Sequence, residues 1–377
     1  MVTKDSQNLY NLRHARLADA LQAAGLDSLA LNAGFSLYYL TGLNFHLSER
    51  PVVMIFTPPN PPVLVLPKFE AGKAESLSFP IQAFSYKEEP STWEDVFKQA
   101  ARAVELNGKK MGIEPRRMRV LELRLLEAAA PEAQFISAED QMASLRMYKD
   151  EAEILAMRNA VGIAQRALQA TLPLIQQGMT ERQLAAELTL QLLRHGSDAE
   201  MPFSPIVASG PNSANPHAFP SSRRLAHGDL LILDWGASAQ GYYSDLTRTF
   251  SIGEPESEFR QVADIVARAN KAARTIAAPG VTAAQVDKAA REVIEQAGYG
   301  KYFLHRTGHG LGLEGHEEPY IRAGNLMALK PGMTFTIEPG IYISGRGGVR
   351  IEDDFLITRT GGESLSDLPR DLMIIGI

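Results

Sequence analysis

The segment ILDWGASAQGYYSDLTRTF, residues 232–250, decides the fold of this 377-residue chain. An apolar run ends in Asp234, and a second run begins at Asp245 after a turn that contains glycine. Short apolar runs bounded by turn residues are typical of buried strands. The segment therefore predicts a buried strand hairpin that carries one carboxylate on each strand.

The same strand pattern occurs a second time in the chain. GDLLILDWG (228–236) aligns with GMTFTIEPG (332–340), which places Asp234 opposite Glu338 at the ends of equivalent strands. A second carboxylate follows in each half, and in the second half it is Glu352 of the motif VRIEDD. Two quasi-equivalent halves that face each other would bring all four carboxylates together.

Two helical segments repeat in the same order as the strands. GMTERQLAAELTLQLLRHG (178–196) and GVTAAQVDKAAREVIEQAG (280–298) share their length, a Thr-x-x-Gln element and a closing glycine. The Thr-x-x-Gln element predicts a capping box, in which each side chain bonds a backbone N–H at the helix start. The glycine predicts the left-handed residue that commonly ends a helix.

One histidine differs from the others in its surroundings. His309 lies in RTGHGLG with a glycine on each side. Glycine permits a close approach of the backbone, so we expect His309 to be a metal ligand rather than a packing residue. His14, His46, His195 and His227 are assigned no function.

Four carboxylates and one imidazole form a ligand set for two divalent metal ions. Most of the ligands are oxygen atoms, which makes Mn²⁺ the first candidate and leaves Co²⁺, Fe²⁺ and Zn²⁺ open. Two neighbouring ions can share a hydroxide nucleophile of lowered pKa. Without metal the carboxylates would repel one another, so the metal-free protein should be less stable, or protonated at this place.

Each candidate ligand also has an explanation that needs no metal. Asp245 could pair with the nearby Arg248, and Glu352 could pair with Arg350. A buried aspartate at a strand end, such as Asp234, is often a hydrogen-bonded turn residue. The metal site is favoured by the joint pattern and by none of the residues alone.

Residues 1–145 are predicted to form a smaller α/β domain, and residues 146–377 a second domain. Short apolar runs predict strands, and apolar residues at helical spacing predict helices. The expected strands are 26–33, 51–58, 62–67 and 109–115, and the expected helices are 9–25, 93–107 and 118–130. A long amphipathic helix over 148–177, with acidic residues in its first turn, is expected to open the second domain.

The composition excludes several classes of function. The chain has no cysteine, which excludes disulfides, thiolate metal sites and cysteine nucleophiles. Its net charge of −6 offers no basic surface for nucleic acid or an anionic membrane. No apolar run is long enough to predict a membrane span, and the polar start of the chain does not resemble a signal peptide. A cytoplasmic location is therefore expected.

The motifs LDWGA, YSDLTRTF, TGHGLGLEGHEEP, TIEPG and VRIEDD, in this order, resemble the pita-bread metallopeptidases. That family includes Xaa-Pro aminopeptidases, Xaa-Pro dipeptidases (prolidases), methionine aminopeptidases and the metal-free creatinase. The resemblance implies an α+β chain, with a pita-bread domain that contains a pseudo-twofold repeat. The first domain resembles the creatinase-type N-terminal domain, which favours the proline-peptidase branch of the family.

The resemblance also implies a role for each of the five metal residues. Asp234 matches a ligand of one ion, and Asp245 and Glu352 match ligands that bridge both ions. His309 and Glu338 match ligands of the other ion. Glu338 also matches the carboxylate that performs general acid/base catalysis on the bridging water.

Three further residues match functional positions of the family. His217, in PNSANPHAF, and His316 match histidines that contact the substrate and the tetrahedral intermediate. Arg350 matches a residue that orients a bridging carboxylate. From the residues alone, His217 could be a loop histidine after Pro216, and His316 could be a cap beside two glutamates.

The expected function is a two-metal exopeptidase that hydrolyses the Xaa-Pro bond of dipeptides or short peptides through a metal-bridging hydroxide. An Xaa-Pro dipeptidase is slightly favoured over an Xaa-Pro aminopeptidase, because the short first domain resembles that of compact prolidase-like proteins. The sequence does not assign a residue such as Arg50 or Arg346 to a substrate carboxylate.

Two other classes of function remain as alternatives. A creatinase-type hydrolase of a small C–N compound would use the same fold, and in its metal-free form would not need five intact ligands. An inactive binding module would be expected to have lost a ligand or His217. The resemblance further implies a homodimer.

Overall fold

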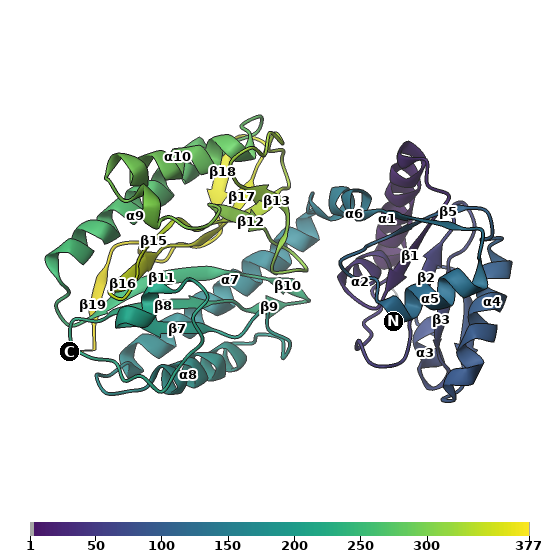
Figure 1. Cartoon of the computed structure of the whole chain (residues 1–377), viewed down its shortest axis with the longest axis horizontal. Helices are drawn as coiled ribbons and strands as arrows, with labels where there is room; N and C mark the ends of the chain where they lie inside the picture. The colour runs from purple at the N-terminus through teal and green to yellow at the C-terminus, as the bar shows by residue number, and fades with distance from the viewer. Residues whose placement is uncertain (1–3, 377) are drawn as a thin grey trace. The chain divides into compact units, whose positions relative to one another are not determined.

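The structure is a computed structural model that describes residues 4–376. The chain divides into two compact units, Met1–Arg146 and Met147–Ile377 (Figure 1). The metal residues expected from the sequence all belong to the second unit. Among the described residues, no helix is both long and apolar enough to cross a membrane.

The first unit is built on a six-stranded mixed sheet with the strand order β4-β3-β2-β1-β5-β6. Only the β1–β2 and β2–β3 pairs are antiparallel. The strands are β1 (Ser28–Asn32), β2 (Val53–Phe56), β3 (Val63–Pro67), β4 (Gln82–Tyr86), β5 (Lys110–Ile113) and β6 (Gln134–Ser137). The helices are α1 (Lys4–Ala24), α2 (Phe35–Thr41), α3 (Ala71–Glu75), α4 (Trp93–Ala103), α5 (Val120–Ala129) and α6 (Glu139–Arg146).

The four strands and three helices expected in the first unit are confirmed, but two edge strands were not predicted. β4 and β6 lie at the two edges of the sheet, and most of their side chains are at least partly exposed. An edge strand needs few buried apolar residues, so its sequence carries a weak periodic signal.

The second unit consists of two similar halves. The first half contains α7 (Glu151–Thr171), α8 (Glu181–Arg194) and a sheet of order β19-β11-β8-β7. The second half contains α9 (Ser257–Ile276), α10 (Ala283–Gln296), a sheet of order β13-β12-β14-β17-β18 and the ribbon β15-β16. In Figure 1 the strands of this unit lie between α9 and α10 on one side and α8 on the other.

The strands β7 to β11 belong to the first half and β12 to β18 to the second, and β19 near the chain end joins the sheet of the first half. Their bounds are β7 (Ile206–Ser209), β8 (Leu230–Trp235), β9 (Ser238–Ala239), β10 (Tyr242–Tyr243), β11 (Leu246–Ile252), β12 (Gly308–Gly310), β13 (Glu317–Ile321), β14 (Thr334–Ile337), β15 (Gly340–Ile343), β16 (Gly347–Arg350), β17 (Asp353–Ile357), β18 (Gly362–Ser364) and β19 (Met373–Ile375). β8 and β11 form the antiparallel pair that the sequence predicts around Asp234 and Asp245.

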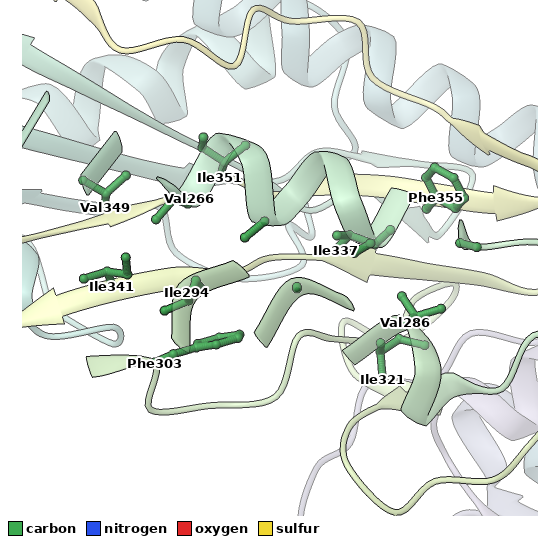
Figure 2. Close-up of a cluster of buried hydrophobic side chains, with 14 of the residues drawn as sticks. Val266, Val286, Ile294, Phe303, Ile321, Ile337, Ile341, Val349, Ile351 and Phe355 are labelled. Atoms are coloured by element: carbon green, nitrogen blue, oxygen red, sulfur yellow. The ribbon is translucent and has the colours of Figure 1, made fainter. Parts of the chain in front are cut away.

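Each half has its own apolar core between helices and sheet. In the second half, side chains of α9 and α10 such as Val266 and Val286 belong to one buried cluster with Ile337 of β14, Phe355 of β17 and Ile351 between β16 and β17 (Figure 2). Full burial of one such side chain stabilises the fold by about 1.5–3 kcal/mol. The strand ends that carry the carboxylates are therefore attached to well-packed elements.

The helix starts follow the predicted capping chemistry. Thr180 with Gln183 and Thr282 with Gln285 form reciprocal capping boxes at α8 and α10. Asp150 caps α7 in the same way, and the helix ends at Thr171 before a 3-10 turn that contains proline. The internal repeat is thus present in local hydrogen bonding as well as in topology.

A single backbone bridge joins the two halves beside the predicted ligands. Thr247 of β11 and Glu352, between β16 and β17, form an isolated antiparallel bridge. The Glu352 N–H donates to the Thr247 carbonyl at 3.0 Å. Because Glu352 itself forms the bridge and Asp245 lies two residues before Thr247, the bridge brings the two halves of the predicted ligand set together.

Candidate metal centre

The two repeated strands place their carboxylates at equivalent positions. Asp234 is the fifth residue of β8, and Glu338 follows the last residue of β14 directly. Both strands are fully buried, so their backbones are fixed by neighbouring strands on each side. The Glu338 N–H also donates to the Thr307 carbonyl at 2.7 Å.

A hydrogen bond fixes the backbone of Asp245 in the first half, and another fixes the carboxylate of Glu352 in the second half. The Asp245 N–H donates to both oxygens of Asp354, at 3.3 and 3.1 Å. The Thr247 hydroxyl donates to Glu352 Oε2 at 2.7 Å. Asp245 and Glu352 are both buried, and the bond from Thr247 fixes the direction in which the Glu352 carboxylate points.

His309 occupies a position that only glycine neighbours allow. A Cβ on Gly308 would lie 1.8 Å from the Thr336 carbonyl oxygen, and one on Gly310 would lie 2.3 Å from the Glu318 carbonyl oxygen. The imidazole Nδ1 lies 3.1 Å from the Gly310 carbonyl oxygen. That contact is satisfied when Nδ1 carries the hydrogen, which leaves Nε2 as the free lone pair.

The imidazole faces carboxylates from both halves of the unit. His309 Nε2 lies 3.7 Å from Asp245 Oδ2 and 3.7 Å from Glu338 Oε1. Ligand atoms of Asp245, His309 and Glu352 all lie within 4.8 Å of one another. A divalent ion with ligand distances of about 2.0–2.2 Å fits between atoms at this spacing.

Burial and mutual repulsion dominate the electrostatics of the site. Burial raises the pKa of Asp245 well above its usual range, and the charges of Glu352 and Asp234 raise it further. Burial, followed by repulsion from Glu338 and Asp234, has the same effect on the pKa of Glu352. Burial also raises the pKa of Glu338 to about 7. Such a cluster needs a proton or a cation to be stable near neutral pH.

One oxygen of the cluster has no protein partner. Asp234 Oδ2 accepts a hydrogen bond from Arg350 at 2.5 Å, whereas Asp234 Oδ1 is buried and without any hydrogen bond. An unpaired buried carboxylate oxygen costs free energy, so its presence needs an explanation. An oxygen-rich donor set with one orphaned carboxylate oxygen and a free imidazole nitrogen fits a divalent ion.

The two simple ion pairs that could have explained these residues are absent. Arg248 bonds to Asp353 at 2.7 Å and to the Glu352 carbonyl oxygen, not to the carboxylate of Asp245. Arg350 bonds to Asp234 and not to the carboxylate of Glu352. Arg350 also donates to the Thr247 hydroxyl at 3.1 Å, and that hydroxyl donates to Glu352 Oε2. The expectation that Arg350 orients a bridging carboxylate stays a prediction.

All of the predicted site residues line one cavity of about 850 Å³. Its polar part contains the five predicted ligands, Arg350, His217 and His316. Its apolar part comes mainly from two loops, with the side chains of Pro202, Phe203, Pro205, Ile206, Pro216, Phe219 and Pro220. The volume lies in the range of small-molecule sites, about 300–1,000 Å³.

His217 and His316 reach this cavity from opposite halves of the unit. His217 lies on the loop after β7, where its N–H donates to Asn215 Oδ1 at 3.1 Å. The His316 ring lies 3.9 Å from the His309 ring, measured between centroids. Burial and the neighbouring Arg306 lower the pKa of His316 to about 4, so its imidazole is neutral near pH 7.

The sequence analysis missed His305 and Arg306, which line the same cavity, and Tyr342, which contacts His305. His305 Nε2 lies 2.8 Å from the Tyr342 hydroxyl, and that hydroxyl accepts a hydrogen bond from Arg350 at 2.9 Å. His305 Nδ1 lies 2.7 Å from the Arg306 carbonyl oxygen and 3.9 Å from Glu338 Oε2. The position of His305, four residues before His309, was the available sequence signal for it. Its contact with Tyr342 depends on tertiary packing.

Comparisons with known proteins identify the family of the chain. A model of metallopeptidase family M24 matches residues 155–359, and a model of the creatinase/prolidase N-terminal domain matches residues 13–148. The chain is 39% identical over 376 residues to a probable dipeptidase PepE of Mycobacterium bovis, which covers 98% of this chain and 97% of that protein.

Solved structures show the same similarity along the chain. A prolidase from Thermococcus sibiricus has a TM-score of 0.91 and 35% identity, with 97% of this chain and 99% of that chain covered. An X-Pro aminopeptidase from Thermotoga maritima has a TM-score of 0.83 and 33% identity, with 96% and 99% covered. The chain therefore belongs to metallopeptidase family M24, in which a creatinase/prolidase N-terminal domain precedes the peptidase domain, and it is an enzyme of that family.

Proposed function

We propose that this protein is an Xaa-Pro dipeptidase that uses two divalent metal ions. The observation that carries the proposal is the shared cavity, in which His309, three buried carboxylates and the partly buried Glu338 face an apolar wall built largely of proline and aromatic side chains. A wall of this kind suits the apolar pyrrolidine ring of a substrate proline. The names of the relatives, among them prolidases and dipeptidases, support the same substrate class.

Membership of a metallopeptidase family implies divalent metal ions at this site. We assign Asp234, Asp245, His309, Glu338 and Glu352 as their ligands, with Mn²⁺ as the first candidate and Co²⁺, Fe²⁺ and Zn²⁺ as alternatives. When bound, the two ions lower the pKa of a shared water and polarise the scissile carbonyl group. The orphaned Oδ1 of Asp234 and the free Nε2 of His309 support this assignment.

The remaining residues bind the substrate and handle protons. Glu338 presents Oε1 to His309 and Oε2 to the side of His305, so Oε2 is the atom we assign to accept the proton of the attacking water. His316 Nδ1 accepts from Arg306 at 3.4 Å, which leaves Nε2–H as a donor to the oxygen of the tetrahedral intermediate. His217 approaches the same cavity from the other half and supplies a second donor.

The second candidate is an Xaa-Pro aminopeptidase, which the similarity to the Thermotoga maritima structure favours. The two activities can be distinguished by measuring the rates at which the Mn²⁺-loaded protein hydrolyses Ala-Pro, Ala-Pro-Ala and Ala-Ala. A dipeptidase cleaves Ala-Pro far faster than the other two peptides, and an aminopeptidase cleaves Ala-Pro-Ala. Preference for Ala-Ala, or full activity after chelation, would contradict the proposal.

A homodimer and a cytoplasmic location remain part of the proposal, on the strength of the family resemblance and of the composition. Sedimentation equilibrium of the full chain tests the first point. A monomer at micromolar concentration would overturn the proposed homodimer. Fractionation of cells tests the cytoplasmic location.

A further inference from the structure

One cation in the cavity wall has no acidic partner. Two arginines line the cavity, and one of them, Arg350, is bonded to Asp234. Among the described residues, no carboxylate lies at ion-pair distance from the guanidinium of Arg306. Arg306 instead lies over the Tyr320 ring, at 4.4 Å from its centroid, and its NH2 group contacts His316. Arg306 is thus the arginine of this cavity that keeps its charge available.

The backbone that carries Arg306 is held on both sides. The His305 carbonyl oxygen accepts a hydrogen bond from Arg291 at 3.0 Å, and Asp287 accepts from the N–H and the hydroxyl of Thr307 at 3.1 and 2.8 Å. The Arg306 carbonyl oxygen itself contacts His305 Nδ1. The guanidinium therefore projects from a fixed base and, because it stacks on Tyr320, loses little further freedom when it binds a ligand.

This guanidinium lies one imidazole away from the predicted metal ligands. Its NH2 group is 3.4 Å from His316 Nδ1, and the His316 ring is stacked at 3.9 Å on the ring of His309. In an Xaa-Pro dipeptide, the carboxylate is separated from the scissile carbonyl carbon only by the proline nitrogen and Cα. An anion bound by Arg306 would therefore be close enough to belong to the residue after the scissile bond.

The two arginines that the sequence left unassigned are already neutralised. Arg50 pairs with Glu49 and Glu88, and Arg346 pairs with Glu256 and Glu258. A substrate carboxylate would have to break these pairs before it could bind there. Neither of these two arginines lines the cavity, in contrast to Arg306.

We propose that Arg306 binds the free C-terminal carboxylate of a dipeptide substrate and so selects dipeptides over longer peptides. This inference rests on the proposed Xaa-Pro hydrolysis and adds the group that recognises the end of the substrate. A guanidinium matches a carboxylate in shape and charge, and an amide or a further peptide bond at the same place offers no negative charge.

The test compares Ala-Pro with its C-terminal amide, Ala-Pro-NH2, which differs only in this charge. The wild-type, metal-loaded protein should prefer the acid by about 10- to 100-fold in kcat/KM, the range expected for charge-assisted hydrogen bonds. Arg306→Met keeps the aliphatic stem over Tyr320 and should bring the acid-to-amide ratio close to one. Arg306→Lys keeps the charge without the fork and should give an intermediate ratio.

The ratio of two substrates on one preparation cancels differences in folding and metal content. Arg346→Met is the matched control, because it removes a paired arginine outside the cavity and should leave the ratio at the wild-type value. If the wild type cleaves neither substrate, the proposed function fails. If it cleaves both equally, or if Arg306→Met lowers both rates and leaves the ratio unchanged, the function stands and the role of Arg306 is wrong.

Discussion

The two carboxylate oxygens of Asp234 have different surroundings. Its Oδ2 is fixed by Arg350, and its Oδ1 is buried without a partner. Burial raises the pKa of Asp234, and the charge of Arg350 acts in the opposite direction. The arginine therefore favours the charged carboxylate and fixes its orientation, and a cation beside the unpaired oxygen would complete its coordination.

At the residue scale, Glu338→Gln should abolish most hydrolysis while the fold is retained. The substitution keeps the shape of the side chain but removes the charge and the proton acceptor. We expect kcat for Ala-Pro to fall by at least about 100-fold, since general acid/base catalysis alone contributes about 10²–10⁴. Steady-state kinetics and circular dichroism check this outcome. Turnover within threefold of the wild type would contradict the two-metal mechanism.

The candidate site could be located from the sequence to the extent that each residue has a local signature. Asp234 and Glu338 follow apolar runs, and His309 needs its two glycines because carbonyl groups pass within 1.8–2.3 Å of where a Cβ would lie. The contact of Arg350 with Asp234 has no local signature. It joins strands that lie more than 100 residues apart, so it follows only from how the halves pack.

At the element scale, Glu181 links a helix to the loop that carries His217. This buried carboxylate is the first residue of α8, and it accepts hydrogen bonds from the backbone N–H and hydroxyl groups of Ser209 and Ser221 and from Asn212. An acidic residue in the first turn of a helix is ordinarily explained by the helix dipole. Because the helix dipole already accounts for an acidic residue at this position, the sequence does not indicate that Glu181 also holds the loop that carries His217.

Glu181→Ala should therefore loosen the loop over residues 209–221. With His217 less well placed, kcat/KM for Ala-Pro should fall by about 10-fold or more, because the bonded N–H groups lose a charged acceptor. Metal content should stay unchanged, and amide hydrogen exchange at Ser209 and Ser221 should become faster. Glu187→Ala, on the same helix, is the control. Equal exchange rates in both variants would show that Glu181 does not hold the loop.

The elements themselves were predictable where local chemistry and packing agree. The capping boxes at Thr180 and Thr282 mark the starts of α8 and α10, and the buried strands β8 and β14 are rich in apolar and β-branched residues. Local sequence signals do not indicate the edge strands β4 and β6 or the loop contacts of Glu181. Their positions depend on neighbours that are distant in sequence.

At the scale of the whole molecule, the stability of the second unit should depend on metal and on pH together. Burial, with repulsion from neighbouring carboxylates, raises the pKa of Asp245 and of Glu352. The folded state then binds more protons than the unfolded state in the range between the ordinary and the raised pKa values. Stability from this source is present at low pH and is lost as the pH rises through that range.

The melting temperature of chelated protein should accordingly decrease between pH 5 and pH 8. Each kcal/mol lost corresponds to roughly 2–4 °C for a domain of this size. Saturation with Mn²⁺ should raise the melting temperature and remove most of this dependence, since the ions replace the protons. Calorimetry with and without metal measures both effects. A chelated protein that became more stable toward pH 8 would contradict the assignment of these carboxylates.

The backbone bridge between Thr247 and Glu352 has a consequence for the order of events during synthesis. A nascent chain that has emerged as far as residue 300 already displays Asp234 and Asp245, but it lacks His309, Glu338 and Glu352. It has therefore no complete coordination sphere to offer. Under the proposed ligand assignment, metal capture would wait until the later half has docked on the earlier one, and bound ions would stabilise only those chains in which docking has succeeded.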